Sequence, residues 1–119
     1  MSVEADFYSL LSGNAGVTAQ VSTRLYPDVL PEDCAYPALV FSRSRTDPVT
    51  GLSGQVFGAD VDLSVGCWAK TRTAADAVAV AVEAALAGSA FIRVGREAMQ
   101  DPETGLLATI LTVTTFATG

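Results

Sequence analysis

The clearest pattern of hydrophobic and polar positions lies in residues 56–69 and has a period of two. One side of this segment is apolar and the other is mostly polar: Val61, Leu63, Val65, Cys67 and Ala69 against Asp60, Asp62, Ser64, Gly66 and Trp68. Such alternation is typical of a strand that buries one face. Two interpretations of the second face stay open. It is either a solvated face with Trp68 packed over an edge, or a surface that meets another subunit.

Two segments carry the periodicity of an amphipathic helix. Residues 3–12 place three apolar side chains on one face: Phe7, Leu10 and Leu11. Acidic residues in the first turn favour a helix there, because they interact well with the helix dipole. Residues 15–21 allow a further helical turn, and residues 24–26 a short extended piece.

Residues 71–87 predict the second helix, with Thr71 or Thr73 as its N-cap. Nearly half of this segment is alanine, and its polar stripe consists only of Arg72, Asp76 and Glu83. A typical surface helix has a broader charged face. Either the outer side of this helix meets another element, or alanine is there for its helix propensity.

The remaining strands are expected at residues 38–46, 91–99 and 106–117, with a loop at 47–54 and a Pro- and Gly-containing turn at 101–105. The order helix, strand, strand, helix, strand, strand predicts an α+β fold. We expect a four-stranded, mostly antiparallel sheet with two helices packed on one face. Residues 1–119 are expected to form a single domain.

The composition describes a lightly charged surface. Hydrophobic residues make up 50% of the chain and charged residues 17%. A protein that buries part of its surface against copies of itself tolerates such a surface, and so does a compact core of small residues. The net charge of −6 argues against a nucleic-acid partner held by phosphate contacts. We expect no membrane span and no signal peptide, and therefore a protein made and kept in a cytoplasm.

The sequence offers little for chemistry. Histidine, the commonest general acid or base, does not occur. Cys34 and Cys67 are expected to be free thiols, and two cysteines without histidine do not make a zinc site. Asp60 and Asp62 could bind a divalent cation, but no third ligand lies close by, so a solvated acidic face is favoured. We expect no catalytic residue, no cofactor and no metal.

A series of motifs, taken in order, resembles the tail-terminator (tail-completion) proteins of long-tailed phages and of related particles such as gene transfer agents. The series begins with Val-Ser-Thr-Arg-Leu-Tyr-Pro at residues 21–27, after the first helix. Tyr-Pro-Ala-Leu-Val-Phe follows at residues 36–41. The strand that ends in Cys-Trp at residues 67–68 then leads into an Ala-rich helix. The resemblance covers nearly the whole chain.

The resemblance implies a structural virion protein rather than an enzyme. Members of this family cap the finished tail tube as a hexameric ring, stop tube polymerisation and join the tail to the head-completion (stopper) protein of the neck. The implied partners are copies of the chain, the tail-tube protein and the stopper protein, with DNA only passing through the lumen. Candidate contact residues on this chain are Asp60, Asp62, Trp68, Asp76, Glu83, Thr50, Gly51 and Leu52. Two alternatives remain open: another neck component, or a small cytoplasmic ligand-binding α+β domain.

Overall fold

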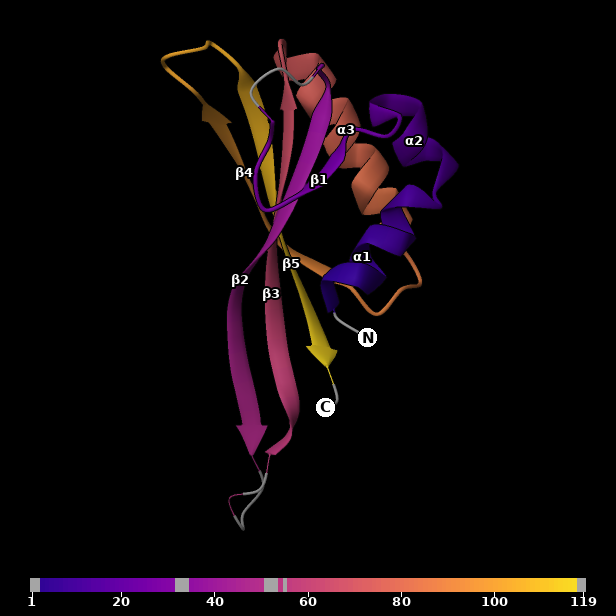
Figure 1. The fold of residues 1–119 in the computed structure, drawn as a ribbon, viewed down its shortest axis with the longest axis vertical. Coiled ribbons are helices and arrows are strands. Elements are labelled where there is room, and N and C mark those ends of the chain that lie inside the picture. Colours follow the sequence, from indigo (N-terminus) through magenta and orange to yellow (C-terminus); the bar gives the residue numbers. More distant parts are fainter. Residues whose placement is uncertain (1–2, 32–34, 51–53, 55, 118–119) are drawn as a thin grey trace.

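One five-stranded sheet organises the chain, and the helices lie together on one side of it (Figure 1). The computed structural model describes residues 3–31, 35–50, 54 and 56–117. The strand order is β1-β2-β3-β5-β4, with β1 parallel to β2 and all other neighbours antiparallel. In chain order the elements are α1 (Val3–Ser12), α2 (Ala15–Val21), β1 (Leu25–Pro27), β2 (Ala38–Thr50), β3 (Val56–Ala69), α3 (Arg72–Leu86), β4 (Ile92–Gln100) and β5 (Leu107–Ala117).

The α+β class and the one-sided placement of the helices are confirmed, but the expected number of elements is wrong. The structure has three helices and five strands where two and four were expected. The additional elements are α2 and β1, of 7 and 3 residues. The sequence indicates both, as a helical turn at residues 15–21 and an extended piece at 24–26, but they were not counted as elements, since an isolated helix of that length is marginal in water. Here α2 is held by its N-cap Asn14 and by the burial of Val17 and Val21.

The expected end of β2 at residue 46 is also wrong, because the strand continues to Thr50. Pairing with β3 persists through Pro48, opposite Ala59, to Thr50, opposite Val56. Proline usually indicates a loop, but an edge strand tolerates it where no neighbour needs its missing N–H. The segment is such an edge, since β1 pairs only with Leu39 to Phe41.

The core lies between the sheet and the helices. The alternation in β3 is confirmed, because its apolar side chains are at most 1% exposed: Val61, Leu63, Val65, Cys67 and Ala69. Phe7 of α1 packs edge-on against Phe41 of β2 and Phe91, with ring centroids 5.5 and 5.0 Å apart. These aromatic contacts attach the first helix to β2 and to the residue directly before β4.

Helix α3 packs closely on the sheet because small side chains line its inner face. Ala75 and Ala79 are fully buried beside Val78 and Val82. The N-cap is Thr71, whose hydroxyl oxygen accepts a hydrogen bond from the Ala74 amide at 3.1 Å.

The aromatic contacts of Phe7 generate a stability prediction. Phe7→Ala removes a fully buried ring that joins α1 to the sheet, so we expect a loss of about 3–5 kcal/mol in the free energy of unfolding. Denaturant unfolding followed by circular dichroism measures it. Ser9→Ala, an exposed position on the same helix, is the control. Equal effects of the two variants would contradict the assignment of Phe7 to the core.

Candidate functional site

The second face of the sheet carries no helix in the part of the chain that the structure describes (Figure 1). On β3 this face holds Asp60, which is exposed, and Asp62, which is half-buried. Across from Asp60 on β5 stands Phe116, 49% exposed. The face therefore combines acidic residues with uncovered apolar ones. Exposed apolar side chains beside acidic ones make this face a candidate contact surface.

Trp68 lies over a patch of small residues on this face. Its cross-strand neighbours Ala38 and Ala108 are both fully buried. A Cβ atom added to Gly66 would stand 2.9 Å from Trp68 Nε1 and 3.1 Å from Val40 Cγ1. The indole thus rests directly on the backbone of Gly66, which only glycine permits. Trp68 covers its own sheet face, and its outer side stays partly exposed.

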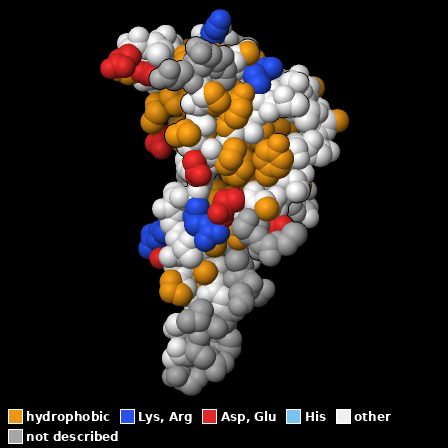
Figure 2. All heavy atoms as spheres, in the orientation of Figure 1, with side chains coloured by type: hydrophobic (Ala, Val, Ile, Leu, Met, Phe, Trp, Pro, Cys, Tyr) orange, Lys and Arg blue, Asp and Glu red, His pale blue; other side chains and the backbone are white. Residues whose placement is uncertain are grey.

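Further apolar side chains adjoin Trp68. Val40 and Ile110 flank Gly66 on the neighbouring strands and are half-buried. Met99, level with Ala108 on β4, is 47% exposed. Figure 2 shows hydrophobic side chains gathered in the upper half of the surface on view, with charged side chains of both signs at the upper end and near the middle.

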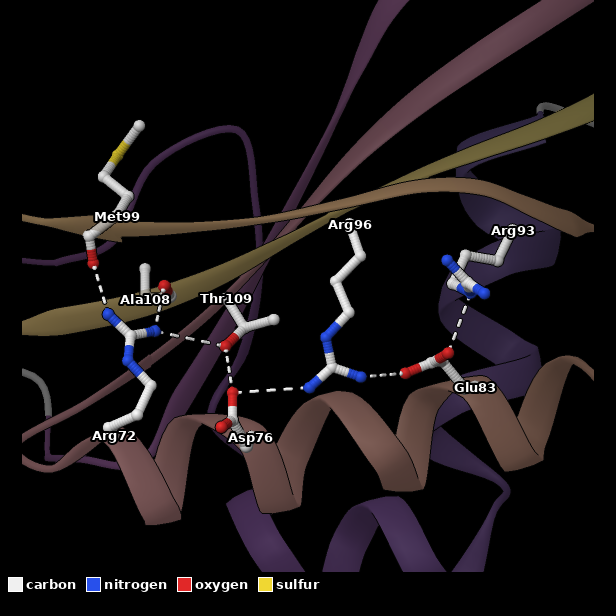
Figure 3. Close-up of polar contacts among 8 residues, drawn as sticks. All are labelled: Arg72, Asp76, Glu83, Arg93, Arg96, Met99, Ala108 and Thr109. Atoms are coloured by element: carbon white, nitrogen blue, oxygen red, sulfur yellow. Dashed lines mark hydrogen bonds and ion pairs between the residues drawn. The ribbon is translucent and has the colours of Figure 1, made fainter.

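The polar stripe of α3 faces β4 and forms a chain of ion pairs (Figure 3). Arg96 pairs with Glu83 at 2.8 Å and with Asp76 at 3.4 Å. Arg93 also pairs with Glu83 at 2.8 Å. The two arginines come from β4, and the two carboxylates lie two turns apart on α3. These pairs hold the edge strand against the helix, and their side chains are 26–43% exposed.

Arg72 and Thr109 complete this polar contact between helix and sheet. Arg72 donates to the backbone oxygens of Ala108 at 2.7 Å and Met99 at 3.2 Å, which lie on β5 and β4. The Thr109 hydroxyl donates to Asp76 at 2.7 Å. This hydrogen bond, with the charges of Arg96 and Arg72, lowers the pKa of the Asp76 carboxyl against a smaller opposing effect of burial.

Asp76 and Glu83 are therefore engaged within their own chain. The partners that sequence reasoning missed are Arg93 and Arg96, which are three apart on a strand and would normally point to opposite faces. A register shift between Arg93 and Gly95 brings both to the helix side. The outward side of α3 is instead uncharged, with Val80 58% exposed.

Strands β2 and β3 form a hairpin that projects beyond the helices (Figure 1). Thr50 is exposed at the end of β2, and Gly51 and Leu52 lie outside the described residues. Along the hairpin, Arg45 pairs with Asp47 at 2.7 Å, and both side chains are more than half exposed. The structure thus separates the candidates into three groups: the open sheet face, the contact between α3 and β4, and this hairpin.

The described residues contain no group of three or more His, Cys, Asp or Glu that could hold a metal ion. Burial raises the pKa of the Cys67 thiol to about 12, so this thiol stays protonated and unreactive at neutral pH. Cys34 lies outside the described residues. A shallow groove of about 370 Å³ runs between α1 and the sheet, lined by Glu4, Ala5, Tyr8, Ser9, Pro27 and Phe41. Its one charged side chain, Glu4, bonds to Arg43 at 3.0 Å.

Residues 5–117 match the family model of the tail completion protein gp17. The chain belongs to this family. The resemblance seen in the sequence is thereby confirmed. As a member of this family the chain is a structural component of a virion and not an enzyme.

Solved structures share the fold. A chain in the virion of a native gene transfer agent particle superposes with a TM-score of 0.80 at 21% identity, covering 99% of this chain and 96% of that one. The gp17 protein of bacteriophage SPP1 gives a TM-score of 0.55 at 18% identity, covering 98% of this chain and 88% of that one. No curated protein matches the sequence. No helix among the described residues is long and apolar enough to cross a membrane.

The lowered pKa of Asp76 predicts a pH-dependent contribution to stability in this family member. Because the folded-state pKa lies below the unfolded value of about 4, the contribution is complete above that pH and is lost as the pH falls through the folded-state pKa. Thr109→Val removes the hydrogen bond and should raise the pKa of Asp76. Carboxyl-carbon NMR titration measures this shift. Thr112→Val, on the opposite face of β5, should leave the pKa unchanged.

The contact between Trp68 and Gly66 predicts a spectroscopic effect. Gly66→Ala should displace the indole, expose it to water and shift its fluorescence maximum to longer wavelength, with a cost of about 1–3 kcal/mol. The chain has one tryptophan, so the signal is unambiguous. Gly95→Ala is the matched control, since its Cβ would meet Thr112 at an ordinary 3.6 Å. An unchanged spectrum for Gly66→Ala would disprove the packing of Trp68 described above.

Proposed function

We propose that this chain caps the completed tail tube as a hexameric ring, stops tube polymerisation and joins the tail to the stopper protein of the neck, with DNA passing through the ring. The observation that carries the proposal is the family match over residues 5–117, nearly the whole chain. The likeness to a chain of a gene transfer agent virion supports the same fold and no more.

The shape of the subunit fits a place in a ring. A ring requires two different surfaces on each copy that complement each other. The helices cover one face of the sheet and leave the other open, so the chain has clearly distinct sides. The open face carries Asp60 and Asp62, and the net charge of the chain is −6. A negative lumen repels phosphate and lets DNA pass without sticking.

The tail-tube and stopper proteins are the proposed partners at the two ends of the ring. The β2–β3 hairpin projects beyond the helices, and its exposed side chains contribute little to the core (Figure 1). A two-stranded ribbon is marginally stable by itself, so a partner that covers it would stabilise it. We assign the hairpin, with Thr50 at the end of β2, to contact with one of these partners.

Electron microscopy of particles made with and without the chain tests the proposed function. Tails of uncontrolled length that fail to join heads in its absence are the expected result. Tails of normal length that only fail to join heads would move the chain to another position in the neck. Normal particles would overturn the proposal and favour the ligand-binding alternative.

A further inference from the structure

The sheet has two strand edges without a neighbouring strand in the described part of the chain. β4 ends the strand order on one side, and its outer edge is free along residues 92–100. On the other side, β1 covers β2 only from Leu39 to Phe41, so β2 is uncovered from Ser42 to Thr50. A free edge presents unpaired backbone donors and acceptors to any strand that approaches it.

The two free edges run in directions that suit each other. β2, β3, β5 and β4 alternate in direction, so β2 and β4 are antiparallel. A second copy placed beside the first in the same orientation therefore offers its β2 to β4 as an antiparallel neighbour. Strand direction therefore keeps alternating from β4 of one copy to β2 of the next. Because the two edges differ, the contact is of the heterologous kind that forms a ring when the rotation closes.

Charge and side-chain direction select one register. Glu97 is level with Ile110 and Gly66 on the open face, and Arg45, level with Asp62, points to the same face. Glu97 is the only carboxylate of β4 and takes part in no ion pair among the described residues. The Arg45 side chain pairs with Asp47 of its own strand at 2.7 Å and is 67% exposed, so it remains open to a second carboxylate. Placing Glu97 opposite Arg45 pairs opposite charges, and a slip by one residue would turn the side chains to the wrong face.

Proline restricts how far the pairing extends. Pro48 has no N–H to donate, so the ladder on β2 is confined to residues 42–47. With Glu97 opposite Arg45, these residues face 95–99 of the neighbouring β4, and the register irregularity at Ser44 accommodates the extra residue. The free edge of β2 thus contributes a short, well-defined segment.

The register also satisfies the geometry of a closed ring. On β3, Glu97 is level with Gly66 and Arg45 is level with Asp62. The two positions are therefore offset by four residues along the strands. This is roughly 13 Å along the strands, against roughly 19 Å across four strands, at about 3.3 Å per residue and 4.8 Å per strand. The strands then incline by roughly 35° to the ring axis, close to the tilt of closed barrels. Figure 1 shows the direction of this offset, with β4 toward the upper end of the sheet and the free part of β2 toward the lower end.

We propose that residues 95–99 of β4 pair antiparallel with residues 42–47 of β2 in the next copy, with Glu97 opposite Arg45. The inference rests on the proposed ring and assigns its subunit contact. The sheets of successive copies then form one continuous barrel. The helices lie outside, because they would obstruct the lumen, and Asp60, Asp62 and Trp68 face the axis.

Cysteine cross-linking in purified particles tests the pairing. The variant carries Arg45→Cys and Glu97→Cys with Cys34→Ser, and Cys67 stays because it is fully buried. Directly opposite residues lie within disulfide range, so mild oxidation should link copies into multimers up to a closed ring. The matched control replaces Arg45→Cys with Thr46→Cys, which points to the helix side. We expect roughly tenfold more cross-linked chain than in the control, since oppositely directed Cβ atoms are not bridged without backbone movement.

Charge reversal provides an independent measurement. Arg45→Glu or Glu97→Arg alone should reduce the fraction of tails that carry the chain, and the double reversal should restore it. Circular dichroism of each variant verifies folding. Capped tails without cross-linking above the control would overturn the strand pairing and leave the proposed capping function intact. If even the unaltered chain is never found on tails, both the strand pairing and the proposed capping function are overturned.

Discussion

The burial of one face of β3 beneath the helices is the constraint on which the rest of the structure depends. Val61, Leu63 and Val65 are at most 1% exposed, and α3 packs on them through Ala75 and Ala79. Burial of apolar area is the main favourable contribution to folding. Because the apolar residues of β3 alternate strictly with polar ones, they all point into the core between the sheet and the helices. The opposite face then has only water, or another molecule, to contact.

The structure stabilises that second face and its edges by means other than a helix layer. Trp68 spreads over Gly66 between two buried alanines, which protects the backbone of the sheet without adding an element. At the β4 edge, Arg93 and Arg96 connect the strand to α3 by ion pairs. Exposed pairs of this kind contribute little individually, about 0–1 kcal/mol each, so they position β4 more than they stabilise the fold.

The sequence predicts the parts of the fold that carry long periodic patterns. The alternation of β3 and the helix at residues 3–12 appear in the structure as expected. The helical turn at residues 15–21 and the extended piece at 24–26 were also identified, as α2 and, within one residue, β1, but they were left out of the expected count because elements of 7 and 3 residues depend on tertiary contacts for their stability. Among the candidate residues, Asp60, Asp62 and Trp68 lie on the open face as the alternation predicts. The partners of Asp76 and Glu83 depend on the register irregularity in β4, which no local pattern reveals.

A sheet covered on one face and open at both edges has three surfaces on which association can occur. The helices cover one face of the sheet, so partners can contact the sheet only at its open face and its two edges. β1 closes the upper part of one edge, so the free part of β2 lies lower than β4 on the other edge. An offset between complementary edges produces a tilt when copies join, and a tilt is the condition for a curved sheet to close. The three-residue strand β1, the smallest element of the fold, therefore sets the stagger of the proposed ring.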